Sequence, residues 1–380
     1  MKVKTWHLFF IATVLFVVSF YVVNLRFDKF YRINGINNDD RILLETYLTE
    51  EEQIYLVDNQ VSMDLFIDFL KEKDFQLQNY KYYNLIKETK RYDNKKEIVE
   101  IGNKLYFKTN EYFKEKAYDY AKEIVLAGLE KSYISKNSFN YSYLSMYKNL
   151  KSLYERDDMV YVEHCNRYVD ILKSYNITDL KQCETIIELL SNAFTKDSLY
   201  EYFNYKYNDN VHMVFNPYDL TTIVNSQYYI GQFEPDNLIL IQDVPRIRYS
   251  MYLQGDAYYA LLNMYNDLKQ YYEGFLLKES YLSYDKLESL GGFSEEQLGL
   301  TIHVTQSETP YDTFHETDIS KWLEANSYKY GFVLRYPLNK DTFTSRSYDS
   351  HIYRYVGLEN AEKIYNQSLS LDEYNQLDKE

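Results

Sequence analysis

Two cysteines are the first residues whose chemistry depends on where the chain places them. Cys165 and Cys183 lie 18 residues apart, and outside a cell such a pair can form a disulfide that joins two neighbouring helices. Two buried thiols are the other interpretation. His164 stands beside Cys165, but a catalytic histidine and cysteine must meet in space, so their adjacency in the sequence does not indicate a reactive pair.

No sequence motif for nucleotide chemistry or for the common hydrolases is present: the chain has no glycine-rich phosphate loop, no GxSxG and no HExxH. The net charge of −15 argues against a general phosphate-binding surface, and we expect no nucleic-acid partner. Two cysteines exclude a disulfide-dense scaffold and a four-cysteine zinc ribbon. The 45 tyrosines among 380 residues suit a surface that faces sugars or the cell wall, although an AT-rich coding sequence produces the same excess.

The first apolar segment predicts the compartment. Residues 6–23 carry no formal charge, and at ~1.5 Å per residue they cover nearly the thickness of a bilayer core. No small-residue cleavage pattern follows, so we expect a cytoplasmic tail over residues 1–5, an uncleaved signal anchor over residues 6–24, and the bulk of a single-pass protein outside the cell membrane. A cleaved signal peptide is the alternative. Residues 1–32 hold five basic and one acidic side chain, so the remainder carries −15 − 4 = −19.

The region after the anchor, residues 33–200, is expected to be helical throughout. Thr49 and Glu52 have the spacing of a capping box at a helix start. Ser62 is expected to cap a further helix, with an apolar face within residues 65–70. We interpret this region as a rigid spacer or a surface for a partner.

The sequence pattern changes after about residue 205, where proline and glycine separate shorter segments. The periodicity predicts a helix over residues 256–272, and strands over residues 331–336 and 352–356. Helices and strands in mixed order indicate an α+β domain over residues 205–380.

Several blocks of this half resemble the VanY-type D-alanyl-D-alanine carboxypeptidases, which are zinc enzymes that trim peptidoglycan stem peptides. The sequence WL at residues 322–323 with YGFVLRYP at 330–337 is similar to a specific block of that family, and YRYVG at 353–357 with LDEY at 371–374 is similar to its closing block. Weaker similarity extends the match to residues 160–375. The resemblance implies a C-terminal D,D-carboxypeptidase-like domain, with a small antiparallel sheet flanked by helices.

The resemblance also assigns positions to the metal site, and their residue types differ here. The family motif S-x-H-x-x-G-x-A-x-D aligns with residues 294–303, so Glu296 takes the place of a zinc-binding histidine and His303 that of the aspartate. The third ligand, a histidine in E-x-W-H, aligns with Ile352, which cannot bind a metal. Asp349 takes the place of the catalytic base.

The implied substrate groove is altered as well. The family segment S-G-Y-R-S aligns with residues 279–283, so Leu282 replaces the arginine that we expect to hold the terminal carboxylate of the substrate. Ser294 and Tyr353 are the other residues expected to line this groove.

A rearranged metal site is the alternative. Glu296, His303 and His351 would supply one carboxylate and two imidazoles for zinc. Strand alternation opposes this set because neighbouring residues point to opposite faces, although a bulge at residues 350–351 would turn His351 inward. His315 is a further candidate ligand, more simply read as a solvated loop histidine.

The substitutions together predict a membrane-anchored, extracellular and catalytically inactive relative of these enzymes, with no cofactor. It would bind a peptidoglycan stem peptide in the former groove, or a cell-wall protein. The alternatives are an active zinc D,D- or L,D-carboxypeptidase that uses the rearranged site, and a structural scaffold that acts through its helical half.

Overall fold

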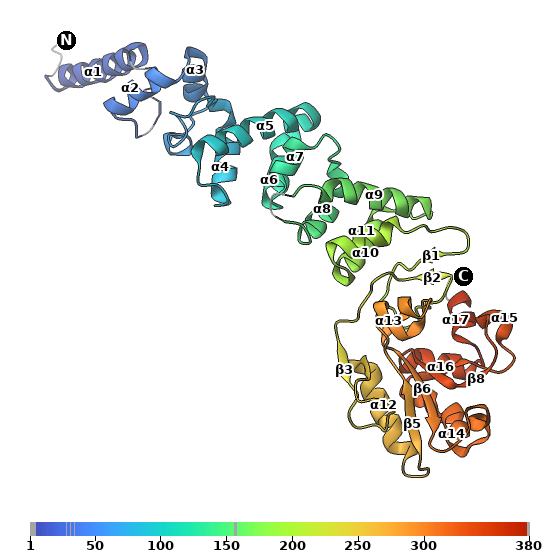
Figure 1. The fold of residues 1–380 in the computed structure, drawn as a ribbon. Coiled ribbons are helices and arrows are strands. Elements are labelled where there is room, and N and C mark those ends of the chain that lie inside the picture. The colour runs from blue at the N-terminus through green and yellow to red at the C-terminus, as the bar shows by residue number, and fades with distance from the viewer. Residues whose placement is uncertain (1–4, 28, 31, 34, 156–157, 378–380) are drawn as a thin grey trace. The chain divides into compact units, whose positions relative to one another are not determined.

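The computed structural model describes all residues except 1–4, 28, 31, 34, 156–157 and 378–380. The chain forms two compact units, Met1–Leu144 and Ser145–Glu380 (Figure 1). In the described residues the first unit is helical. Its α-helices are α1 (Thr5–Phe27), α2 (Asn38–Tyr47), α3 (Glu50–Asp58), α4 (Tyr80–Glu88), α5 (Lys95–Phe113), α6 (Ala117–Leu126) and α7 (Glu130–Ser135).

Helix α1 contains the predicted membrane segment. Residues Thr5–Val23 have a mean hydropathy of 2.2, and none of this stretch is buried. The helix is long and apolar enough to cross a bilayer. A membrane anchor and a signal sequence both have these properties.

The start of α3 confirms the predicted capping box. The backbone NH of Glu52 donates to Thr49 Oγ1 at 3.2 Å, and the backbone NH of Thr49 donates to Glu52 Oε2 at 3.0 Å. The second oxygen of Glu52 accepts from the backbone NH of Leu77 at 2.8 Å, so the cap also ties down a distant turn.

The prediction of a helix after Ser62 is wrong. Only a 3-10 turn forms, Met63–Leu65, because the Ser62 hydroxyl bonds the Asp64 carboxylate and no side-chain cap is made to the backbone. The apolar residues of this stretch still enter the core, where Phe66, Phe69 and Leu70 are buried.

The second unit begins with helices and continues into a mixed domain, which confirms the predicted α+β class. Its α-helices are α8 (Leu144–Lys151), which begins at the unit boundary, α9 (Tyr161–Ser174), α10 (Leu180–Ala193), α11 (Lys196–Asn204), α12 (Gly255–Leu268), α13 (Tyr284–Ser289), α14 (Asp318–Asn326), α15 (Asp341–Thr344), α16 (Leu358–Asn366) and α17 (Leu371–Leu377). Two short strand pairs precede the main sheet: β1 (His212–Met213) with β2 (Tyr228–Tyr229), and β3 (Leu238–Leu240) with β4 (Tyr252–Gln254).

A four-stranded antiparallel sheet forms the centre of this unit (Figure 1). Its strands lie in the order β5 (Phe275–Glu279), β6 (Thr301–Gln306), β8 (Asp349–Tyr355) and β7 (Phe332–Tyr336). The predicted helix over 256–272 and the two predicted strands are confirmed as α12, β7 and β8. Strand β6 is rich in β-branched residues, as a half-buried pleated surface favours.

Helix α11 packs into the mixed domain. The buried Tyr202 hydroxyl donates to the carbonyl of Val214 at 2.6 Å and accepts from its NH at 2.9 Å. The second unit therefore includes the last helices of the region that we expected to be a spacer.

The two cysteines are free thiols, both buried, on α9 and α10. Burial raises the pKa of each thiol above its ordinary value, so neither is an activated nucleophile. The structure therefore favours the interpretation of two buried thiols over the disulfide.

A buried ionic network joins the strands of the main sheet to the elements around it. Glu295 accepts from Arg335 Nε at 2.9 Å and from Arg354 Nη1 at 3.0 Å. Arg335 also pairs with Asp372 of α17, and Arg354 Nη2 donates to the carbonyl of Leu220 at 3.0 Å. Two positive and two negative side chains therefore balance in a core where Arg354 is 0% exposed and Arg335 2%.

We expect Glu295→Gln to destabilise the second unit by about 3–5 kcal/mol, because it leaves the Arg354 guanidinium buried without a counter-charge. The chain has two tryptophans, so Trp322 fluorescence in a Trp6→Phe background reports the urea unfolding of this unit. The matched control is Glu359→Gln, which removes an exposed ion pair with Lys363 on α16 and should leave the transition unchanged. An unchanged midpoint for Glu295→Gln would contradict the role of the network.

Candidate functional site

The main sheet and the turn before β6 bring the aligned metal positions to one face. In the pairing of β6 with β8, His303 lies opposite Ile352 and Thr301 opposite Arg354, so these side chains share a face. The 3-10 turn Glu295–Leu298 leads into β6 and ends at Gly299, which has φ +66. A Cβ at this glycine would lie 2.9 Å from the Leu238 side chain, so the turn requires glycine.

Glu296 and His303 bond directly to each other. His303 Nε2 lies 2.6 Å from Glu296 Oε1, and the Ser294 hydroxyl donates to the other carboxylate oxygen. Burial alone would raise the pKa of Glu296, but His303 and Ser294 outweigh it and lower that pKa to about 2. A carboxylate with so low a pKa is a weak proton acceptor at neutral pH.

Ile352 stands at the position that aligns with the third zinc ligand of the family. It is 2% exposed and faces the same side as His303. Asp349, at the aligned base position, begins β8 and is half-buried. Its Oδ1 accepts the backbone NH of His351 at 2.9 Å.

His351 does not join Glu296 and His303, so the predicted rearranged zinc set is not assembled. Its ring lies on the opposite face of β8, stacked on Tyr311 with centroids 3.8 Å apart and on Phe314 at 4.6 Å. Its Nδ1 is 2.6 Å from the carbonyl of Val304, and its Nε2 is 2.9 Å from the carbonyl of Tyr311. Both ring nitrogens are thus turned toward backbone carbonyl oxygens and not toward Glu296 and His303. The register of β8 against β7 does shift between Asp349 and Tyr353, close to the bulge that we considered, but His351 still faces Tyr311 and Phe314.

Of the three residues predicted to line the substrate groove, two lie beside the Glu296–His303 pair and one does not. Ser294 contacts Glu296, and the backbone NH of Leu282 donates to the carbonyl of Glu296 at 3.2 Å, so both lie beside the pair. The prediction for Tyr353 is wrong: its side chain is 0% exposed on the face away from His303, and a fully buried ring cannot line a groove. His315 is exposed, 3.7 Å from Glu316, as expected of a solvated loop histidine.

The residues that meet at this face do not fit a catalytic zinc site. Such a site needs three protein ligands and an open fourth position. Glu296 and His303 supply two donors, which already bond each other, and Ile352 supplies none. In the described part of the chain, no group of three or more histidine, cysteine or carboxylate side chains could hold a metal ion.

Arg346 is the charged residue of this region that sequence reasoning missed. Its guanidinium lies 4.5 Å from the centre of the Tyr336 ring, and its Nη1 donates to the Tyr336 hydroxyl at 3.3 Å. Burial lowers the pKa of Arg346, but Tyr336, Asp349 and Glu296 together raise it. The sequence did offer one signal for Arg346. It lies in the loop between β7 and β8, shortly before Asp349, which aligns with the catalytic base of the family.

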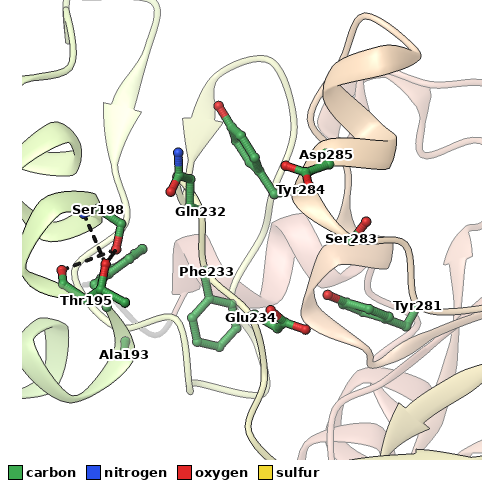
Figure 2. Close-up of a pocket in the computed structure, with 11 residues that line it drawn as sticks. Ala193, Thr195, Ser198, Gln232, Phe233, Glu234, Tyr281, Ser283, Tyr284 and Asp285 are labelled. Atoms are coloured by element: carbon green, nitrogen blue, oxygen red, sulfur yellow. Dashed lines mark hydrogen bonds between the residues drawn. The ribbon is translucent and has the colours of Figure 1, made fainter.

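A pocket of about 350 Å³ lies next to the segment that carries Leu282. Figure 2 shows Thr195 and Ser198 on one wall, Gln232, Phe233 and Glu234 in the middle, and Tyr281, Ser283, Tyr284 and Asp285 on the opposite wall. Burial, followed by the charges of Glu234 and Asp285, raises the pKa of Tyr281 to about 12. The lining includes two carboxylates and no lysine or arginine, so this pocket does not suit the carboxylate of a peptide.

Comparison with known proteins identifies the mixed domain. The family model described as VanY, D-alanyl-D-alanine carboxypeptidase, matches residues 254–358. A Bacillus subtilis protein named "Putative carboxypeptidase YodJ" is 30% identical over 207 residues, which cover 46% of this chain and 74% of that protein. A D-alanyl-D-alanine carboxypeptidase of Enterococcus faecalis is 45% identical over 85 residues, 22% of this chain and 30% of that protein.

Solved structures of similar proteins match less than half of the chain. The LdcB LD-carboxypeptidase is 30% identical and covers 45% of this chain and 92% of its own, with a TM-score of 0.42. VanYB in complex with D-alanine-D-alanine is 24% identical and covers 41% of this chain and 97% of its own, with a TM-score of 0.34. With 74% of the Bacillus relative covered at 30% identity, the chain belongs to the VanY-type D-alanyl-D-alanine carboxypeptidase family.

Proposed function

We propose that this protein is a membrane-anchored, wall-facing member of its family that binds peptidoglycan stem peptides without hydrolysing them. The observation that supports this proposal is the bond between Glu296 and His303, beside a buried Ile352. These three residues occupy the positions that the family resemblance assigns to the zinc ligands. Two of them bond each other and the third has no donor atom.

The energetic cost of losing the metal is large. Zinc lowers the pKa of bound water from 15.7 to about 7, and roughly nine pK units correspond to about 12 kcal/mol of access to hydroxide. A general base contributes only about 10²–10⁴-fold. Asp349 as a base could therefore not replace the metal.

Peptide binding does not require the metal. The charges of Asp349 and Glu296 act on Arg346 and help to raise its pKa, and a guanidinium can bind a terminal carboxylate through two parallel hydrogen bonds. We infer that Arg346 takes over part of the role lost where Leu282 replaces the family arginine. A cell-wall protein bound at the same face is the other form of this proposal.

The cellular location that we propose rests on α1. We infer that α1 remains as a membrane anchor, with the second unit outside the cell, where peptidoglycan lies. Because residues after 32 carry a net charge of −19, attraction to anionic wall polymers by charge alone is not expected. An active zinc carboxypeptidase and a scaffold that acts through the helices are alternative outcomes of the experiments below.

The first experiment measures zinc and turnover. After metal-free purification and reconstitution, we expect the full chain to hold no stoichiometric zinc and to release no D-alanine from a stem pentapeptide. The matched variant combines Glu296→His, His303→Asp and Ile352→His, which restores the family residue types, and it should take up close to one zinc per chain. One chelator-removable zinc in the unaltered chain, with D-alanine release that Glu296→Ala and His303→Ala abolish, would establish the active alternative.

The second experiment tests Arg346. We expect Arg346→Ala to weaken binding of a stem pentapeptide by about 10–100-fold, because a charge-assisted hydrogen bond is lost. Titration calorimetry on the full chain in detergent measures the dissociation constant. Lys329→Ala, at an exposed lysine whose Nζ donates to Asn326, is the control and should bind as the wild type does. Equal binding by all three proteins would show that Arg346 does not hold the peptide.

The third experiment uses the lowered pKa of Glu296. A depressed carboxyl pKa stabilises the folded chain above the ordinary value of 4.5, and this contribution is lost as the pH falls through about 2. The wild type should exceed Glu296→Gln by about 3 kcal/mol in free energy of unfolding at pH 6, and by progressively less toward pH 2. Urea unfolding followed by Trp322 fluorescence measures both proteins in the Trp6→Phe background. Glu316→Gln, at an exposed carboxylate, is the control; a difference that does not change with pH would argue against the pair.

A further inference from the structure

A separate pocket of about 510 Å³ lies where β1, β2, α15 and α17 come together in the second unit (Figure 1). None of the residues that surround the Glu296–His303 pair lines it. Tyr175, which follows α9, and the segment between β1 and β2 form part of its wall. Its volume falls within the range of small-molecule sites, ~300–1,000 Å³.

Aromatic rings held by backbone pairing form part of this wall. His212 and Tyr228 are paired residues of β1 and β2, and their ring centroids are 5.5 Å apart. Tyr175 and Phe215 form an edge-to-face pair at 5.7 Å. Phe343, from α15, is 44% exposed on the same pocket. Such rings offer flat apolar surfaces at a low cost in conformational entropy.

Three asparagines add fixed polar groups. Asn216 Oδ1 accepts the backbone NH of Tyr218 at 3.0 Å, and Asn225 Oδ1 accepts the NH of Gln227 at 2.8 Å. Each side chain is thereby oriented, and its amide NH₂ makes no hydrogen bond to another described residue. Asn375 Nδ2 donates to the carbonyl of Thr221 at 2.7 Å, which leaves its Oδ1 as an acceptor. The pocket thus combines oriented donors with an oriented acceptor.

The two carboxylates that line the pocket both make contacts within the chain. Asp219 Oδ1 accepts from the NH and the hydroxyl of Thr221, each at 2.8 Å. Asp372 pairs with Arg335 in the buried network. No lysine or arginine is among the lining residues. A phosphate or carboxylate ligand would find no counter-charge here, whereas an uncharged ligand would meet no penalty for lacking one.

We propose that this pocket binds an uncharged saccharide of the kind found in amino-sugar glycans. The flat C–H face of a sugar ring can pack on the exposed aromatic rings, while hydroxyl and acetamido groups can use the oriented amides of Asn216, Asn225 and Asn375. Five aromatic rings and three fixed amides around one cavity match this ligand class better than a peptide, whose terminal charge would be unpaired. The saccharide site is independent of peptide binding at the Glu296–His303 face.

Substitution of asparagine by aspartate tests the amide donors without removing the turns. Asn216→Asp and Asn225→Asp keep the Oδ1 that accepts the backbone NH and replace the NH₂ donor by a charged oxygen. We expect each change to weaken binding of an N-acetylglucosamine tetrasaccharide by at least about fivefold in calorimetric titration of the full chain in detergent. Asn208→Asp is the matched control, because Asn208 Oδ1 accepts the NH of Asn210 at 2.8 Å in a similar turn outside the pocket.

A second pair of variants tests the aromatic wall. Phe343→Ala should weaken tetrasaccharide binding by about fivefold, whereas Tyr271→Ala, which removes an exposed aromatic side chain outside the pocket, should leave it unchanged. Stem-peptide binding should be the same in all of these proteins, so failure of either proposal is seen separately. No binding of the tetrasaccharide at millimolar concentration, or equal weakening by the pocket and control variants, would overturn the saccharide site.

Discussion

The second unit depends on a single buried carboxylate that two arginines share. Glu295 lies in a turn, while Arg335 and Arg354 come from the adjacent strands β7 and β8. A buried charge without a partner costs several kcal/mol, so all of these elements must be in place together. Asp372 completes the balance from α17 and fixes the last helix against the sheet.

The residues that form this network differ from those at the aligned metal positions. Glu295 and Glu296 are neighbours in one turn, but the first belongs to the ionic core and the second bonds His303. The blocks that carry the family resemblance, LRYP, YRYVG and LDEY, supply Arg335, Arg354 and Asp372. A chain can therefore keep these blocks for packing while the residue types at the metal positions change, since the network does not include them.

Sequence reasoning succeeded where the determining interactions are local or follow from alignment. Thr49 and Glu52 of the capping box are three residues apart, and Glu296 and His303, which align with two metal positions of the family, bond each other. It failed for Tyr353, because β8 is buried on both faces and its residues show no polar alternation that identifies the face of His303. The ionic network could not be predicted, because Glu295 lies 40 residues from Arg335 and 59 from Arg354.

The helices before the mixed domain are more than a spacer for it. Tyr202 of α11 inserts its hydroxyl between Val214 and Tyr229, and Tyr175 after α9 contributes to the wall of the polar, aromatic pocket. On the opposite side of this pocket, Asn375 ties α17 to Thr221, next to the carbonyl of Leu220 that holds Arg354. The ionic core therefore supports both faces of the unit: the strands that present Glu296 and His303, and the loop and helix that enclose the second cavity. The sites proposed for the peptide and for the saccharide therefore rest on one rigid framework, and neither has to move for the other to be filled.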